Sequence, residues 1–156
     1  MSSVLSRKAV TELLLRVKRQ KRLNFEDIAK KLNKNKVWTT AAILGQHPMS
    51  ECEANTVLDI FGIDSTNNEQ YEEIKNLLME IPTRGNQPWP PTDPTIYRLY
   101  ELMQVYGPSI KALAHEQCGD GIISGINCEL DMNKKSIENE DWVEIKILGK
   151  FLRYPK

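Results

Sequence analysis

The feature that most limits how this chain can fold is a proline-rich segment just past its middle. Four of the residues in 83–94 are proline. Proline lacks a main-chain N–H and fixes φ, so neither a regular helix nor a central strand can run through such a segment. The sequence therefore predicts two structural units, over residues 1–82 and 94–156, joined by a semi-rigid linker over residues 83–93.

Residues 1–82 show only helical patterns. Apolar residues recur at the spacing of one helix face, as Val10, Leu14 and Val17 do in the first helix. Ser50 is followed three residues later by Glu53, a pattern typical of a capping box. The patterns predict five short helices in a small bundle, and the second and third resemble a helix-turn-helix. Three helix starts are marked by the capping residues Ser6, Asn24 and Ser50.

The bundle is basic at its start, although the whole chain has a net charge of zero. Residues 1–40 contain 11 lysines and arginines against three acidic residues. Such asymmetry is typical of a nucleic-acid-binding arm, of a contact with an acidic partner, or simply of a solvated helix face. The third predicted helix, residues 36–44, lacks the polar side chains that reach base edges in the major groove. We favour a solvated face and keep a DNA-binding regulator as the alternative.

The cysteines and histidines exclude two further classes of protein. Cys52, Cys118 and Cys128 are odd in number and widely spaced, which argues against a disulfide framework and against a zinc site. His47 and His115 stand alone, so we expect no metal. No apolar run is long enough to span a membrane. The basic, amphipathic first 22 residues are also typical of a transit peptide, but they fit a structural helix, and we expect a cytoplasmic location.

Residues 94–156 combine helical and extended patterns. Asp93 is a good cap for a helix that begins at Pro94. Gly107 and Pro108 predict a break, after which a second helix ends before Gly119. The pattern then predicts three segments: an extended run over residues 122–132, a polar turn over 133–141 and a half-buried alternating strand over 142–147.

This second unit is small for its content. Two helices and two strands in about sixty residues cannot enclose a core of their own. The remedy that we expect is an intertwined dimer, in which strands pair or exchange between subunits. The expected fold class is therefore α+β: an N-terminal all-α bundle that resembles a helix-turn-helix domain, and a small C-terminal α+β dimerisation domain.

Candidate site residues lie on both parts of the second unit. Arg98 and Glu101 are three residues apart on the first predicted helix, so they share one face. Ser124 lies in the glycine-rich segment 119–127, which turns into the extended run. An arginine, a carboxylate and a hydroxyl on separate short elements suit the binding of a small anion. The plainer interpretation is a surface ion pair and a strand hydroxyl.

Segments 91–107 and 119–127 closely resemble the signature of the cyanase (cyanate hydratase) family. The resemblance is strong over about residues 79–131, and it is weaker but consistent in layout over the N-terminal half. Residues 149–152 match an end segment of the family, whereas residues 153–156 depart from it. Cyanases carry a bundle that resembles DNA-binding domains and do not use it on DNA, so the resemblance implies no nucleic-acid partner.

The resemblance implies a specific reaction: bicarbonate and cyanate combine and split into carbamate and carbon dioxide, and carbamate then yields ammonia. It implies no cofactor, with bicarbonate as co-substrate, and a role in cyanate detoxification and nitrogen metabolism. It also implies a homodecamer built from five dimers. Arg98, Glu101 and Ser124 would be catalytic, and Ile123 would join Arg98 and Ser124 in substrate binding. A non-catalytic interaction module on this scaffold, and an enzyme for another small anion, stay open.

Overall fold

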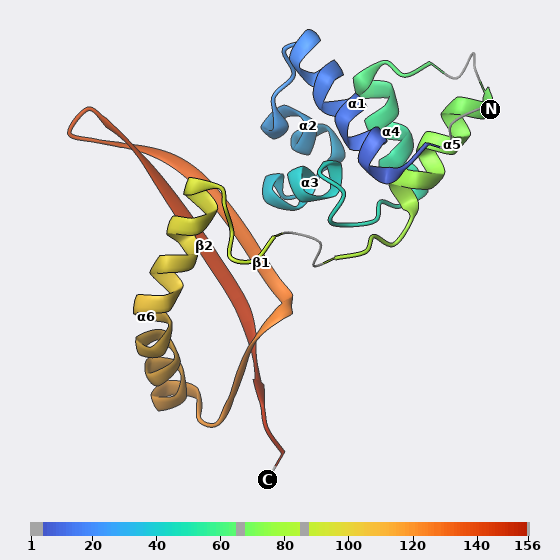
Figure 1. The fold of residues 1–156 in the computed structure, drawn as a ribbon. Helices are drawn as coiled ribbons and strands as arrows, with labels where there is room; N and C mark the ends of the chain where they lie inside the picture. The colour runs from blue at the N-terminus through green and yellow to red at the C-terminus, as the bar shows by residue number, and fades with distance from the viewer. Residues whose placement is uncertain (1–4, 65–67, 85–87, 156) are drawn as a thin grey trace.

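The computed structural model describes residues 5–64, 68–84 and 88–155. Within these ranges, five helices form an N-terminal bundle, and a long sixth helix lies beside a two-stranded antiparallel sheet (Figure 1). The expected α+β class is confirmed. In chain order the elements are α1 (Arg7–Gln20), α2 (Phe25–Leu32), α3 (Lys36–Ile43), α4 (Glu51–Phe61), α5 (Asn68–Met79), α6 (Pro94–Cys118), β1 (Gly121–Ile137) and β2 (Glu140–Arg153).

The bundle helices begin where the capping residues predict. The side chains of Ser6 and Asn24 each accept a hydrogen bond from a main-chain N–H in the first turn of the following helix. At α4, Ser50 Oγ accepts from Glu53 N at 3.3 Å, and Ser50 N donates to the Glu53 carboxylate at 2.7 Å. This reciprocal pair satisfies two main-chain donors that a helix start leaves without partners. Gly62 then ends α4 in the left-handed region, with φ 65°.

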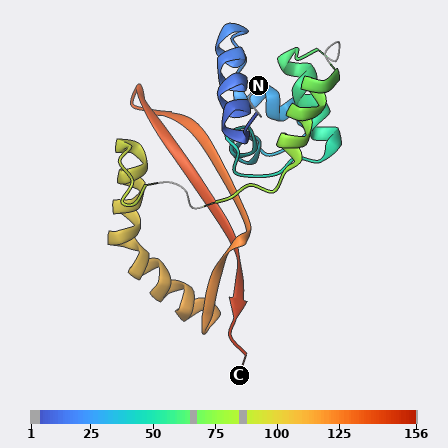
Figure 2. The ribbon, with the colours of Figure 1, turned by 45° about the vertical axis from the view of Figure 1, so that its right-hand side comes forward.

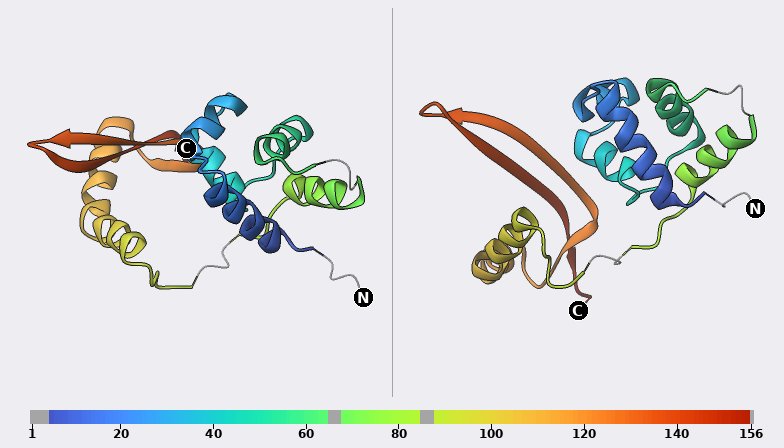
Figure 3. Two further views of the ribbon diagram at one scale, coloured as in Figure 1. Left: turned by 90° about the horizontal axis from the view of Figure 1, so that it is seen from above. Right: turned by 45° about the horizontal axis from the view of Figure 1, so that its top comes forward.

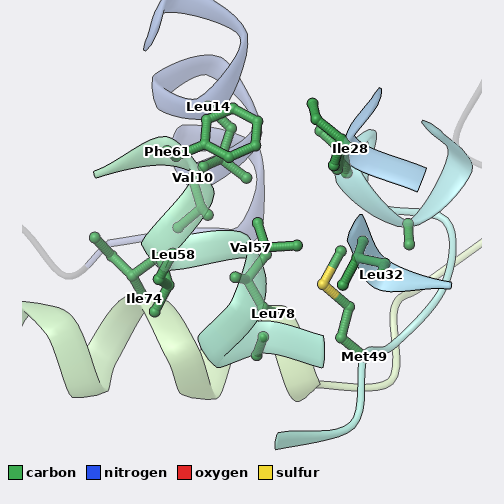
Figure 4. Close-up of a cluster of buried hydrophobic side chains, with 13 residues drawn as sticks. Val10, Leu14, Ile28, Leu32, Met49, Val57, Leu58, Phe61, Ile74 and Leu78 are labelled. Carbon is green, nitrogen blue, oxygen red and sulfur yellow. The ribbon is translucent and has the colours of Figure 1, made fainter. Parts of the chain in front are cut away.

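The bundle has its own hydrophobic core (Figure 4). Val10 and Leu14 of α1 are fully buried beside Phe61 of α4, Leu78 of α5 is fully buried near Val57, and Ile28 of α2 lies at one side. Each buried side chain of this size contributes about 1.5–3 kcal/mol to stability. The basic N-terminal segment is therefore a structural helix, as its apolar spacing predicts.

Helix α6 corrects one prediction. The break expected at Gly107 is wrong, because α6 runs unbroken from Pro94 to Cys118 with Pro108 inside it. The proline ring removes one N–H and crowds the carbonyl of the preceding turn, which bends a helix. Figure 2 shows α6 bending near its middle. The residues next to Pro108 are not strong helix formers, but residues 101–104 and 111–114 on either side of them are, and no residue of α6 is buried, so water can solvate the freed carbonyl.

The β-hairpin corrects a second prediction. The polar turn expected over residues 133–141 is wrong, because both strands continue into this region. The chain reverses at Glu138 and Asn139, whose φ values are 52° and 64°. Two positive φ angles are typical of the tight type I′ turn that joins paired strands. The polar residues of this arm are held across the strands, as Lys134 and Asp141 are by an ion pair of 2.7 Å.

The C-terminal elements leave most of their apolar surface exposed in a single chain. No residue of α6 is buried, and within the described part of the two strands only Gly121 and Ser124 are. The strand expected to be half-buried over residues 142–147 is instead largely accessible, with Trp142 at 52% and Ile147 at 61% exposure. These elements enclose no core by themselves, which agrees with the expectation from their size.

The bundle and the hairpin meet at α3, the bundle helix that contacts β1. Lys36 Nζ at the start of α3 donates to Asn133 Oδ1 at 2.8 Å, and Asn133 Nδ2 donates to Asp131 at 3.0 Å. The Asn133 hydrogen bond is the main cause that lowers the pKa of Asp131, with the charge of Lys36 adding to it. Both views of Figure 3 show the hairpin extending away from the bundle beyond this contact.

The predicted linker lies partly outside the described residues, at 85–87. Its remaining residues are neither helix nor strand. Trp89 packs edge-on against Tyr100 of α6, with the ring centroids 4.8 Å apart. Among the described residues, no helix combines the length and the apolar character needed to cross a bilayer.

Candidate active site

Arg98 and Glu101 lie one turn apart on α6 and form an ion pair, in which the guanidinium donates to the carboxylate. Their side chains are 75% and 41% exposed. The hydrogen bond to Glu101, reinforced by its charge, raises the pKa of Arg98 above its ordinary value. Because a guanidinium has five N–H donors in a planar fork, Arg98 can hold Glu101 and an anionic ligand together.

Ser124 is in the opposite situation, with only 6% of its surface exposed. Its Oγ accepts hydrogen bonds from the main-chain N–H groups of Ile126 at 3.2 Å and Asn127 at 2.9 Å. A hydroxyl has two acceptor positions and one donor. Both acceptor positions are thus occupied, and the O–H is the group left to donate. Such a hydroxyl suits an anionic oxygen as its partner.

Ser124 is the first residue of a large bulge in β1. Ile123 pairs with Phe151, and the next pairing joins Cys128 to Gly149, so residues 124–127 face a single residue of β2. We call residues 124–127 the bulge loop. β1 bends sharply partway along its length (Figure 1), as a bulge of this size makes a strand do. Ser124, the first residue of the bulge loop, is buried, whereas Ile123 before it and residues 125–127 after it are exposed.

The structure brings the predicted site residues together in two pairs, which we call the cation half-site (Arg98 and Glu101) and the donor half-site (Ile123 and Ser124). The residues of each pair are close to one another, but their contacts do not link the pairs. Arg98 is bonded to Glu101, whereas Ser124 is bonded to its own bulge loop. From Arg98, α6 continues for about 30 Å before β1 begins at its other end. Among the described residues of one chain, no hydrogen bond or ion pair therefore joins the two half-sites.

Several groups around the donor half-site receive no role from the sequence pattern. Cys128 Sγ donates to Gly125 O at 3.2 Å and so closes the bulge loop. His115 Nε2 lies 3.0 Å from Gly121 O and ties the end of α6 to the start of β1. Gly149 lies directly opposite Cys128. The sequence points to Gly149 only through its position in residues 149–152, which match an end segment of the family that the sequence resembles.

The described ranges contain no group of three or more His, Cys, Asp and Glu residues arranged to hold a metal ion. The Glu101 carboxylate is paired with Arg98, and the other groups of the two half-sites are a guanidinium, a hydroxyl and main-chain N–H groups. These are donors for an anion and not ligands for a cation.

Comparisons with known proteins find relatives over nearly the whole chain. A family model described as the cyanate lyase C-terminal domain matches residues 88–156, which include both half-sites. A second family model, described as the N-terminal part of cyanate hydratase, matches residues 7–75.

Individual relatives match at similar levels. The cyanate hydratase of Variovorax paradoxus (strain S110) is 40% identical over 151 residues, covering 96% of this chain and 98% of that protein. The cyanate hydratase of Burkholderia ambifaria (strain MC40-6) is 43% identical over 149 residues, covering 94% and 91%. The crystal structure of cyanase from T. urticae superposes with a TM-score of 0.81 at 39% identity, covering 92% of this chain and 96% of that one.

Proposed function

Because the chain belongs to the cyanate hydratase family, its activity is that of a carbon–nitrogen lyase acting on cyanate, and we propose that bicarbonate is its second substrate. A bicarbonate oxygen adds to the carbon of cyanate and forms a dianionic adduct. The adduct takes up one proton and splits into carbamate and carbon dioxide. Carbamate takes up a second proton and yields ammonia and a second carbon dioxide. The reaction uses no cofactor besides this co-substrate.

The proposed roles follow from the charge that the reaction concentrates. Two anions must approach each other, so the site needs fixed positive charge and hydrogen-bond donors in a place shielded from water. Arg98 supplies the charge, and its fork suits a carboxylate-like group. Ser124 O–H and Ile123 N–H donate to substrate oxygens. Glu101 orients Arg98 or passes a proton.

The observation that carries these roles is the hydrogen bonding of Ser124. The hydroxyl is nearly buried, and its oxygen already accepts two main-chain N–H groups. A nucleophilic serine needs a base within hydrogen-bond reach of its proton. A donor to an anion needs only the free O–H that this arrangement leaves, so binding is the role that the geometry supports.

We also propose that the active site is completed between subunits. The cation half-site is open to water in a single chain, where the attraction between charges is weak. Apolar side chains beside it on α6 are exposed in the single chain, at 41% for Leu99, 48% for Leu102 and 51% for Met103. Contacts between copies would cover them and bring a donor half-site from another chain. We propose a homodecamer of five dimers with intertwined strands, since closed symmetry repeats the same contact.

A DNA-binding role is not favoured. In a helix-turn-helix protein the recognition helix must be free to enter the major groove. Here the first turn of α3 contacts β1, and Lys36 is bonded to Asn133. A protein with this scaffold and no catalytic activity would release no ammonia at all.

We propose that residues 1–82 form the bundle domain and that residues 94–156 form the catalytic and dimerisation domain. We also propose that the protein works in the cytoplasm, where its cysteines stay as free thiols.

The deciding experiment measures ammonia released from cyanate by the purified protein, with and without added bicarbonate in buffer freed of carbon dioxide. We expect release to depend on bicarbonate, and to survive treatment with a chelator. Ammonia release that continues unchanged without bicarbonate would contradict the two-substrate mechanism. No release under any condition would favour the non-catalytic module.

A further inference from the structure

Gly149 lies against the donor half-site, at a position where no side chain fits. A Cβ built on it would lie 2.4 Å from Ile123 Cγ2 and 3.1 Å from the main-chain oxygen of Ser124. The first distance is shorter than real Cβ contacts. The φ angle of Gly149 is outside the left-handed region, unlike those of Gly45, Gly62 and Gly119. Space, and not backbone conformation, is what requires a glycine here.

The atoms that press on this space cannot move away freely. Cγ2 of Ile123 is attached at the branched Cβ, so it moves only with the rotamer or with the main chain. The bulge loop is held from its other side, because Ser124 Oγ accepts from the N–H groups of Ile126 and Asn127. Cys128 Sγ adds a further bond to Gly125 O. A methyl group at position 149 would therefore displace Ile123 and Ser124 as a unit.

We propose that Gly149 is a positioning residue for the reaction: its missing side chain lets the bulge loop settle on β2 and so places Ile123 N–H and Ser124 O–H for the substrate anion. This inference rests on the proposed function of the donor half-site. Gly149 itself touches no substrate. Donors of this kind act only at a well-defined position, and a displacement of about 1 Å can cost about 10²-fold in rate.

The test compares three variants of the full-length protein: Gly149→Ala, Ile123→Ala and the double variant. Gly149→Ala should lower kcat/KM for cyanate about 10²-fold, mainly through kcat, and should weaken inhibition by oxalate, a small dianion. Ile123→Ala keeps its main-chain N–H, removes Cγ2, and serves as the reference for the double variant. Because the clash is then gone, the double variant should regain at least tenfold over Gly149→Ala.

Gly121→Ala is the matched control. Gly121 is another crowded glycine of the same hairpin, where a Cβ would lie 2.3 Å from Leu152 O and 2.7 Å from the Phe151 ring. Phe151 is the cross-strand partner of Ile123, but the shorter contact is with the main-chain oxygen of Leu152, which a change of the Ile123 side chain does not relieve. Ile123→Ala should therefore rescue Gly149→Ala and leave Gly121→Ala unrescued. Equal rescue of both glycine variants would mean that Ile123→Ala merely loosens the hairpin, and would overturn the inference.

The remaining outcomes separate the inference from the function on which it rests. If the unmodified protein releases no ammonia from cyanate, the proposed function fails. If the unmodified protein is active and Gly149→Ala is equally active, or is impaired without rescue, the inference is wrong and the function stands. If Gly149→Ala does not assemble, the double variant decides. Restored assembly and activity would support the contact with Ile123, and an unfolded or inactive double variant would overturn it.

Discussion

The Ser124 hydroxyl is the most constrained polar group of the donor half-site, since two main-chain N–H groups hold its oxygen. We predict that Ser124→Ala lowers kcat about 10²–10³-fold, the usual cost of losing one preorganised donor. Steady-state ammonia release measures the effect. Ser136→Ala, an exposed serine near the tip of the same strand, is the matched control and should keep its activity. A fully active, correctly assembled Ser124→Ala variant would remove Ser124 from the site.

Arg98 tests the cation half-site. Arg98→Lys keeps the charge and loses the planar fork, so we predict a drop in kcat/KM of roughly ten- to a hundredfold, which corresponds to about 1.5–3 kcal/mol for a hydrogen bond to a charged group. Inhibition by oxalate should weaken in parallel. Glu101→Gln should also lower the rate, because it removes the partner that holds Arg98. Wild-type kinetics in either variant would show that its residue has another role.

Arg98, Glu101 and Ser124 could be proposed as candidates from short sequence segments, and their structural surroundings could not be predicted from those segments. The burial of Ser124 and the space under Ile123 depend on the pairing of Cys128 with Gly149, far along the chain. Strand register and bulges are set by such distant partners, and local patterns do not contain them. This is why Gly149 has no predicted role in spite of lying within a matched segment.

Among the helices and strands of the described residues, α4 is the one whose N-terminus has a complete capping box. Ser50 and Glu53 cap it reciprocally, and the Glu53 carboxylate also forms an ion pair with Lys34 of the α2–α3 turn, with Nζ and Oε1 2.8 Å apart. We predict that Ser50→Ala destabilises the bundle by about 1 kcal/mol, the typical cost of losing an N-cap. Urea unfolding at a fixed protein concentration, followed by helix content, measures this. Ser50→Asp should retain most of the stability, because aspartate also caps well.

The same element predicts a dependence on pH. Burial alone would raise the pKa of Glu53, but hydrogen bonds from Lys34 and from Ser50 outweigh it and hold the pKa below the ordinary 4.5. The contribution of Glu53 is therefore fully present above pH 4.5 and is lost as the pH falls through the lowered value. Glu53→Gln should be less stable than the wild type at pH 7, and the difference should shrink on acidification. A constant difference down to pH 3 would contradict this.

Elements defined by local signals were predictable, and those decided by solvent or by distant partners were not. The caps of α1, α2 and α4 are contacts within four residues, so the sequence contains them. The break expected at Gly107 fails because an exposed helix can leave a carbonyl to water. The polar turn fails because ion pairs across the strands hold lysines in an extended arm.

At the scale of the whole molecule, mixing two variants tests the proposal that each active site combines half-sites from different chains. Arg98→Ala subunits carry an intact donor half-site, and Ser124→Ala subunits carry an intact cation half-site. After gentle dissociation and reassembly together, some sites should receive both intact half-sites, and activity should partly return. Each variant taken through the same procedure alone is the control. Well-formed hybrids without activity would show that each site belongs to one chain.

Assembly should also govern activity in the unmodified protein. Binding between copies shifts with concentration by mass action, so dilution should lower specific activity together with sedimentation coefficient. Substituting the exposed Leu102 by Glu should have the same effect without dilution, because it places a charge on the apolar face of α6. A fully active monomer would contradict the shared site.

The exposed apolar face of α6 has a consequence for how the protein is made. The buried core ends at Leu78, so the bundle can close as soon as the first half of the chain has been synthesised. α6 and the hairpin are synthesised after the bundle, and in the proposed assembly their apolar surface is covered only when another copy binds. During that interval, productive pairing and aggregation compete for one surface, and both speed up as unassembled chains accumulate. The yield of active protein should then be set by the rate of synthesis relative to that of encounter, and slow expression should favour it.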